Sequence, residues 1–273
     1  MTNHVTSVQV DPTVAALSAA AGRTADLLRA IPDPNAPVPG LTWTAAETAA
    51  HLVADLEVYT DVVRGRVTEP ADAGSATAAE LGTAENRRQL AESTDRDLGR
   101  LAAELTAAMP VYLDVAAAAP SDQRTSSPIG MALTPATVSA ILLGEQLMHG
   151  LDLARAAGRP WPISAAEARL VIPGLMDLLP GYLDRDQARG LHIRYELRFG
   201  QGQTYQLAID DGTGTVTAPA GRPDCVITAD PVAFLLVGYG RASQWSQILR
   251  GKIRAGGRKP WLGFRFAQLT VSP

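Results

Sequence analysis

The sequence predicts an α+β protein in which a four-helix bundle precedes a domain built on an antiparallel sheet. Apolar residues recur at helical spacing between residues 14 and 157. After Pro160-Trp161-Pro162 the pattern changes to alternating strands and turn residues, with helices between them. Runs of helices followed by runs of strands are typical of α+β proteins. We therefore expect two domains, 1–160 and 161–273.

Capping residues and helix breakers set the ends of the expected bundle helices. Thr44 and Glu47 have the spacing of a capping box, in which each side chain accepts a hydrogen bond from the other residue's backbone N–H. Pro32 and Pro110 are expected to end the first and third helices, because proline lacks an N–H. Gly158 follows the fourth in the position that favours glycine. The four helices are expected over 14–31, 44–66, 77–109 and 136–157, with an extended piece over 111–119.

The second half begins with an expected helix over 164–182, which Pro173 and Gly174 can interrupt. Residues 192–199 then alternate in polarity, as a half-buried strand does. Turn residues between 210 and 214 predict a hairpin. Further strands are expected over 203–209, 215–217, 225–229 and 251–255, and helices over 231–237, 243–249 and 260–269.

The composition excludes several classes of protein. The chain has 273 residues, of which 46% are hydrophobic and 19% charged, and a net charge of −4. These values are typical of a globular protein and argue against nucleic-acid binding. No segment approaches the roughly 20 consecutive apolar residues of a membrane span. The single cysteine, Cys225, suits a reducing compartment, and residues 1–10 lack the features of a signal peptide. We expect a cytoplasmic protein, monomeric or a small homo-oligomer, without nucleic-acid or membrane partners.

Two histidines and one glutamate form the predicted site. Glu145 and His149 are four residues apart in one expected helix, so both side chains lie on the same face. His51 lies in a second helix, and all three side chains converge if the two helices pack together. Two imidazoles and one carboxylate leave a fourth position open, as at a catalytic zinc. Iron, nickel and manganese use similar ligands, so the sequence leaves the metal open.

Each part of this site has a simpler interpretation. A lone histidine in a helix is most often a surface or satisfied core residue, and a Glu145–His149 pair can be solvated. The neighbouring residues are apolar, however, and a buried carboxylate needs a partner, which a divalent ion would supply. Asp152 and Asp55 are spaced to hold the two imidazoles, although Asp152 can equally pair with Arg155.

No other reactive centre is evident in the sequence. It has no glycine-rich phosphate loop and no Gly-x-Ser-x-Gly nucleophile motif. Cys225 lies alone in an expected strand, where a thiol packs as a core residue. The two remaining histidines are His4, near the N-terminus, and His192, at the start of a strand.

Two segments of the sequence resemble a known family. The segment from Val38 to Leu52 resembles the first signature of the DinB-like, mycothiol-dependent maleylpyruvate isomerase family. The segment from Gly144 to Ala154 is similar to the second, Glu-x-x-x-His-Gly-x-Asp-Leu-Ala. The C-terminal half resembles a sterol-carrier-protein-like fold through shorter pieces. The matching pieces are 224–230, Phe234, 251–253 and 263–264.

The resemblance implies a DinB-like bundle that binds a divalent metal, usually zinc, through His51, Glu145 and His149, with mycothiol as thiol cosubstrate. The implied enzyme is a thiol-dependent isomerase or S-transferase. Coordination deprotonates a thiol, and the thiolate would attack an electrophilic small molecule. Addition to a cis-enedioate, rotation and elimination would give the trans isomer. Arg222 and Arg124 are the expected contacts to an anionic substrate, although an exposed structural role is simpler for either.

Two other functions fit the same sequence. The second domain can enclose an apolar ligand, which would make the protein a non-enzymatic carrier with the bundle as scaffold. The metal site can activate water in place of a thiol, which would make the protein a hydrolase.

Overall fold

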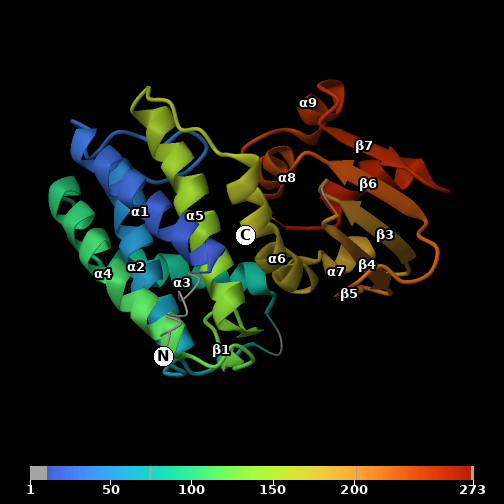
Figure 1. The fold of residues 1–273 in the computed structure, drawn as a ribbon, viewed down its shortest axis with the longest axis horizontal. Coiled ribbons are helices and arrows are strands. Elements are labelled where there is room, and N and C mark those ends of the chain that lie inside the picture. The colour runs from blue at the N-terminus through green and yellow to red at the C-terminus, as the bar shows by residue number, and fades with distance from the viewer. Residues whose placement is uncertain (1–10, 74–75, 201, 272–273) are drawn as a thin grey trace, which may run out of the picture.

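The computed structural model describes residues 11–73, 76–200 and 202–271, so His4 and the segment 1–10 lie outside the described residues. Helices fill the first part of the chain, and a five-stranded sheet with flanking helices fills the second (Figure 1). The predicted α+β architecture, a helical bundle followed by a sheet domain, is confirmed.

Four long helices form the bundle, and a fifth, shorter helix packs beside them. α1 and α2 each pack against both α4 and α5, and α3 packs against α2. The predicted capping box is present at the start of α2, where the Thr44 N–H donates to Glu47 Oε2 at 2.8 Å and the Glu47 N–H donates to Thr44 Oγ1 at 3.2 Å. The helices are α1 (Pro12–Ala30), α2 (Ala45–Val63), α3 (Ala78–Glu92), α4 (Leu98–Ala118) and α5 (Pro135–Ala156).

The single helix predicted over 77–109 is wrong, because the chain forms two helices there. α3 ends at Glu92, and Asp97 caps α4 by accepting a hydrogen bond from the Arg100 N–H at 2.9 Å. α4 then continues through Pro110, so the extended piece expected over 111–119 is also wrong. A proline in a helix interior costs about 3 kcal/mol. Buried side chains on both sides of it, Met109 and Tyr112, offset that cost.

α4 also bears on the expectation that the chain has no membrane span. Within the described residues, it is the helix whose length and composition would allow it to cross a membrane. Here it packs against α1 and α2 as part of the bundle.

The sheet has the strand order β5-β4-β3-β6-β7. Its β4–β5 hairpin turns through Asp211 and Gly212, with φ of 43° and 81°, as the turn signal predicted. The predicted antiparallel sheet is correct for three pairings, but β6 pairs parallel to β3. The segment after β5 crosses to the far side of β3, and no local turn signal marks such a crossover. The strands are β3 (His192–Arg198), β4 (Thr204–Asp210), β5 (Thr213–Thr217), β6 (Cys225–Ala229) and β7 (Ile253–Gly256).

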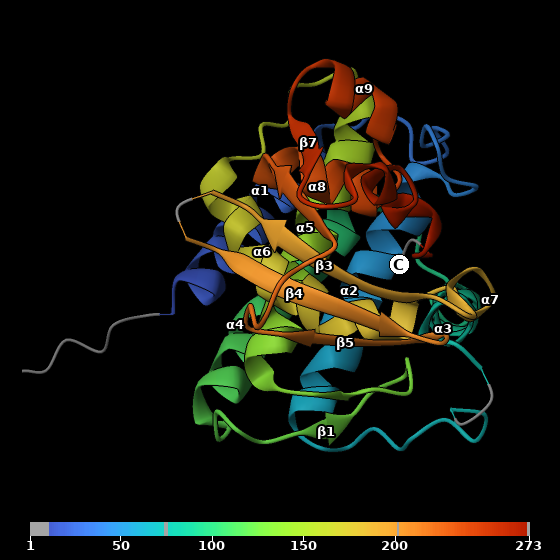
Figure 2. The same cartoon turned by 90° about the vertical axis from the view of Figure 1, so that its right-hand side faces the viewer.

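Two helices of the second half, α6 and α8, lie between the sheet and the bundle. α6 packs against α5 on one side and α8 on the other (Figures 1 and 2). α6 runs unbroken through Pro173, and Gly174 lets it approach α5, because a Cβ there would lie 2.7 Å from Ala140 Cβ. The elements are α6 (Ala165–Leu178), η1 (Leu179–Tyr182), α7 (Arg185–Ala188), α8 (Pro231–Gly238) and α9 (Gln244–Leu249).

The remaining elements are short. The helix expected over 260–269 is a pair of 3₁₀ turns, η2 (Pro260–Phe264) and η3 (Phe266–Gln268). A hairpin of β1 (Thr125–Ser126) and β2 (Ala132–Leu133) precedes α5. Buried apolar side chains form one cluster through both halves, and the domain division at 160 stays a prediction.

Candidate metal centre

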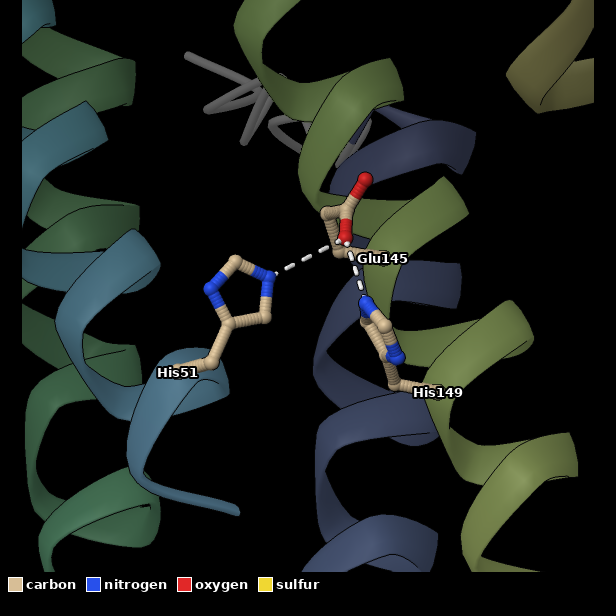
Figure 3. Close-up of side chains that lie close together, drawn as sticks. All are labelled: His51, Glu145 and His149. Atoms are coloured by element: carbon tan, nitrogen blue, oxygen red, sulfur yellow. Dashed lines mark ion pairs between the residues drawn. The ribbon is translucent and has the colours of Figure 1, made fainter. Parts of the chain in front are cut away.

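His51, Glu145 and His149 converge where α2 packs against α5 (Figure 3). The Nε2 atoms of His51 and His149 lie 3.6 and 3.2 Å from Glu145 Oε2, and one ligand atom from each residue lies within 4.8 Å of the others. His51 and His149 are 2% and 7% exposed. The structure therefore brings together all three predicted ligands, and the Nε2 atom of each histidine faces the Glu145 carboxylate.

A divalent ion fits this donor set. Two neutral imidazole nitrogens and a carboxylate oxygen are ligands that zinc and related metals prefer. In the protein alone, the two histidines beside Glu145 compensate its charge. Burial opposes ionisation of Glu145, but the two histidines outweigh it and hold its pKa well below its usual value. The site is thus arranged around a negative charge that attracts a cation.

Gln89 of α3 holds the far side of the His51 ring. Its Oε1 lies 3.0 Å from His51 Nδ1, and its Nε2 donates to Asp55 Oδ1 at 2.9 Å. Because the amide N–H faces Asp55, the amide oxygen faces His51 and selects the tautomer with a proton on Nδ1. When His51 is neutral, its Nε2 lone pair is then free to bind a metal. Asp55 was predicted to hold the imidazole directly; its Oδ2 lies 3.5 Å from His51 Nε2, while Gln89 occupies Nδ1.

Asp152 lies beside the second imidazole, as its spacing predicted. Its Oδ2 is 3.3 Å from His149 Nδ1, and the carboxylate is 1% exposed. Its ion-pair partner is Arg241, from the second half of the chain, whose Nη2 lies 2.6 Å from Oδ2. Burial alone would raise the pKa of Asp152, but the neighbouring His149 and Arg241 outweigh burial and lower it. The simpler interpretation, pairing with Arg155, does not apply.

The charges around His51 favour its protonated form in the metal-free protein. Burial alone would lower its pKa, but Asp55 and Glu145 outweigh burial and raise the pKa of His51 to about 9. A metal that binds here therefore displaces a proton from His51.

The three residues open onto a cavity of about 600 Å³ between the bundle and the second half. Trp43 packs over both rings, with centroids 5.0 Å from His51 and 5.9 Å from His149. Other side chains that line the cavity include Tyr59, Glu85, Arg87, Gln89, Tyr182, Tyr239 and Arg241.

The sequence matches a family at this site. The family model for the mycothiol maleylpyruvate isomerase N-terminal domain matches residues 17–154, just over half of the chain. The matched region contains His51, Glu145 and His149. The chain belongs to this family. The predicted resemblance is thereby confirmed, and so, at the level of the family, is the prediction of an enzyme.

Two solved structures resemble this member of the mycothiol maleylpyruvate isomerase family over most of its length. They are the mycothiol-dependent maleylpyruvate isomerase (12% identity, TM-score 0.50) and its variant with one histidine replaced by alanine (11% identity, TM-score 0.51). Each alignment covers 89% of this chain and 91% of the other. At these identities the likeness concerns the fold alone. No curated protein matches the sequence significantly.

Arg222 and Arg124 do not line the cavity in this family member. Both are exposed; Arg222 precedes β6, and Arg124 donates to the Ala132 carbonyl at 2.8 Å. The arginines that line the cavity are Arg87 and Arg241. Arg87 lies on the expected third helix, but nothing in its local sequence distinguishes it from the adjacent Arg88, which pairs with Glu85 and Glu92.

Proposed function

We propose that this family member is a zinc-dependent, mycothiol-using enzyme, an isomerase or S-transferase of the maleylpyruvate isomerase type that acts on an electrophilic small molecule. The convergence of His51, Glu145 and His149 at the base of a cavity is the observation that carries this proposal. Family membership supports mycothiol as the thiol.

Zinc held by these three residues would lower the pKa of a coordinating thiol, so that the thiolate is available near neutral pH. The protein's own residues prepare that site. Gln89 keeps the Nε2 lone pair of neutral His51 free, and the Asp152 carboxylate lies 3.3 Å from Nδ1 on the far side of the His149 ring. Trp43 covers both rings and excludes water from one side of the site.

An anionic electrophile would need a cationic contact. Arg87 lines the cavity, is exposed, and forms no ion pair within the part of the chain that the structure describes. It is therefore better placed than Arg222 or Arg124 to meet a substrate carboxylate. Thiol addition to a cis-alkene, rotation about the resulting single bond and elimination of the thiol would yield the trans isomer.

A carrier function has one observation in its favour. A second cavity of about 120 Å³, lined mainly by apolar side chains, lies between α6, α8 and the 3₁₀ turns near the C-terminus. An apolar cavity of this order can hold a group about the size of benzene. Copurification of an apolar ligand, in a protein that takes up no zinc, would favour this alternative.

Zinc content is the deciding experiment. We expect about one zinc per chain in the purified protein, loss of zinc in His149→Ala, and retention in the control His192→Ala, whose side chain is exposed on β3 and distant in sequence from the site. Turnover of a cis-enedioate should then require both zinc and thiol. A protein that binds no zinc when it is offered contradicts the proposal, and turnover without thiol favours a hydrolase.

A further inference from the structure

Three buried tyrosines line the cavity around Glu145. Tyr59 comes from α2, Tyr182 from η1 and Tyr239 from the residue after α8, and they are 8%, 8% and 5% exposed. Burial, and then nearby charges that include Glu145, raise the pKa of all three hydroxyls. Each phenol therefore stays protonated and can donate a hydrogen bond.

None of the three hydroxyls forms a hydrogen bond within residues 11–73, 76–200 and 202–271. Buried phenols normally find a partner. Two other buried tyrosines of this chain do so: Tyr112 Oη lies 2.6 Å from Ser139 Oγ, and Tyr195 Oη donates to the Leu262 carbonyl at 3.0 Å. Among the buried tyrosines of the described residues, the lack of partners is thus confined to the three that line this cavity.

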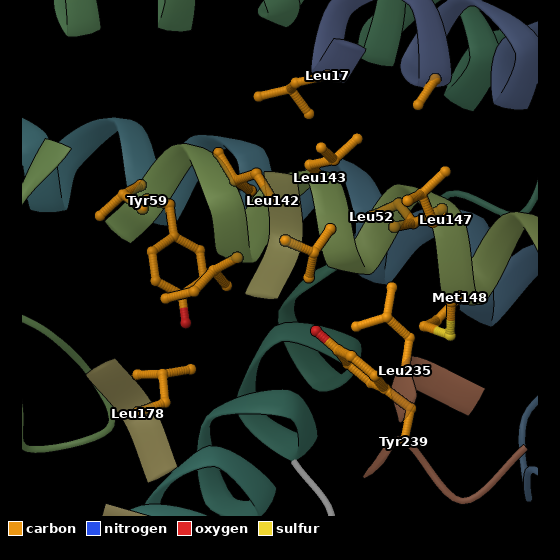
Figure 4. Packing of buried hydrophobic residues seen from close by; sticks show 14 of the residues in the cluster. Leu17, Leu52, Tyr59, Leu142, Leu143, Leu147, Met148, Leu178, Leu235 and Tyr239 are labelled. Carbon is orange, nitrogen blue, oxygen red and sulfur yellow. The ribbon is translucent and has the colours of Figure 1, made fainter. Parts of the chain in front are cut away.

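The backbone of α5 leaves room for one of these hydroxyls. A Cβ at Gly144, the residue before Glu145, would collide with Tyr239 Oη. A Cβ at Gly82 of α3 would lie 3.7 Å from Tyr182 Oη. Figure 4 shows the hydroxyls of Tyr59 and Tyr239 on the same side of α5. Close packing against Gly144 therefore fixes the position of Tyr239 Oη, although this hydroxyl has no hydrogen-bond partner among the described residues.

We propose that the hydroxyls of Tyr59, Tyr182 and Tyr239 form an oxyanion site that binds the carbonyl or carboxylate oxygen of the electrophile. This inference rests on the proposed function and adds residues that position the substrate. The tyrosine hydroxyls can donate hydrogen bonds to a substrate oxygen in this partly buried cavity, where such donors stabilise developing negative charge.

The site suits an alkene conjugated to a carbonyl group. When the thiol sulfur adds its electron pair to the alkene carbon, a C–S bond forms and the π electrons move to the carbonyl oxygen. Hydroxyls of this site donate hydrogen bonds to that oxygen and to the neighbouring carboxylate oxygens without giving up their protons. After rotation about the single bond, the electrons return, the alkene reforms and the C–S bond breaks, which regenerates the thiolate.

Maleate, which carries a cis-alkene between two carboxylates, is a direct probe. We expect zinc-loaded protein to bind maleate in calorimetric titrations, and Tyr59→Phe, Tyr182→Phe and Tyr239→Phe each to bind it about tenfold more weakly, since each loses one hydrogen bond to a charged oxygen. Tyr112→Phe, a buried tyrosine outside the cavity, should bind maleate as the wild type does. All four variants should keep the zinc content of the wild type.

Three results would overturn the oxyanion site. They are unchanged maleate affinity in all three cavity variants, no maleate binding by the zinc-loaded wild type, and loss of zinc together with maleate binding, which would assign the hydroxyls to the metal centre. A wild type that cannot be loaded with zinc contradicts the proposed function instead. In that case the same titration with the metal-free proteins still compares the cavity variants with Tyr112→Phe.

Discussion

Replacing Gln89 by leucine should weaken zinc binding although Gln89 is not a ligand. The substitution removes the acceptor of the His51 Nδ1–H and the donor to Asp55 Oδ1, at 3.0 and 2.9 Å, from a residue that is 3% exposed. Two buried polar groups then lose a partner, at about 1–3 kcal/mol each, so the free energy of unfolding should fall by about 2–6 kcal/mol. Loss of such a partner weakens metal affinity about 10–100-fold.

Gln146→Leu is the matched control. Gln146 is also buried, at 1% exposure, but its Oε1 has no hydrogen-bond partner in the described structure and it does not line the metal cavity. Zinc affinity would be measured by competition with a chromogenic chelator, and stability by urea unfolding of the metal-free proteins. Equal zinc affinities in Gln89→Leu and Gln146→Leu would refute the role assigned to Gln89.

Three further predictions follow from individual contacts. Arg241→Ala should destabilise the protein by about 3–5 kcal/mol in urea unfolding, because Asp152 stays buried without its cation; Asp152→Asn in the same chain should recover part of that loss. Gly144→Ala should lower the free energy of unfolding by about 1–3 kcal/mol, because the new Cβ collides with Tyr239. Gly22→Ala in α1, where a Cβ meets nothing within 4 Å, should raise the free energy of unfolding by about 0.5–1 kcal/mol. Equal effects of the two substitutions would contradict the packing described. The pKa of His51 is raised from 6.5 to about 9, so protonated His51 stabilises the chelator-treated protein fully below pH 6.5, and this stabilisation is lost as the pH rises through 9. Zinc affinity should rise over the same pH range, because zinc and the proton compete for His51. A zinc affinity that does not depend on pH would contradict this prediction.

Local sequence was sufficient to predict the candidate metal ligands and the helices that carry them. The Thr44–Glu47 capping box begins α2, and the four-residue spacing of Glu145 and His149 places both side chains on one face of α5. Both signals act within one or two helical turns. They need no knowledge of the rest of the chain, and the structure brings the three side chains together accordingly.

Helix ends and strand crossovers were harder to predict from the sequence, because tertiary contacts override local conformational preference. Pro110 was expected to end a helix, but burial of Met109 and Tyr112 keeps α4 helical on both sides of it. The break before α4 has a local signal, the cap Asp97, within a segment whose helical pattern appeared continuous. The parallel pairing of β6 with β3 has no local turn signal, because the two strands are joined by a crossover and their register depends on tertiary contacts.

By itself, then, the sequence determined the three candidate ligands, the helices that present them and the family to which the chain belongs. The tertiary structure alone decided what surrounds the ligands. Gln89 meets His51 across 38 residues, and Arg241 meets Asp152 across 89. Periodicity and capping report only on neighbours a few residues apart. Gln89 meets His51 only when α3 packs against α2, and Arg241 meets Asp152 only when the second half of the chain packs against the bundle, so both contacts become visible only in the folded molecule.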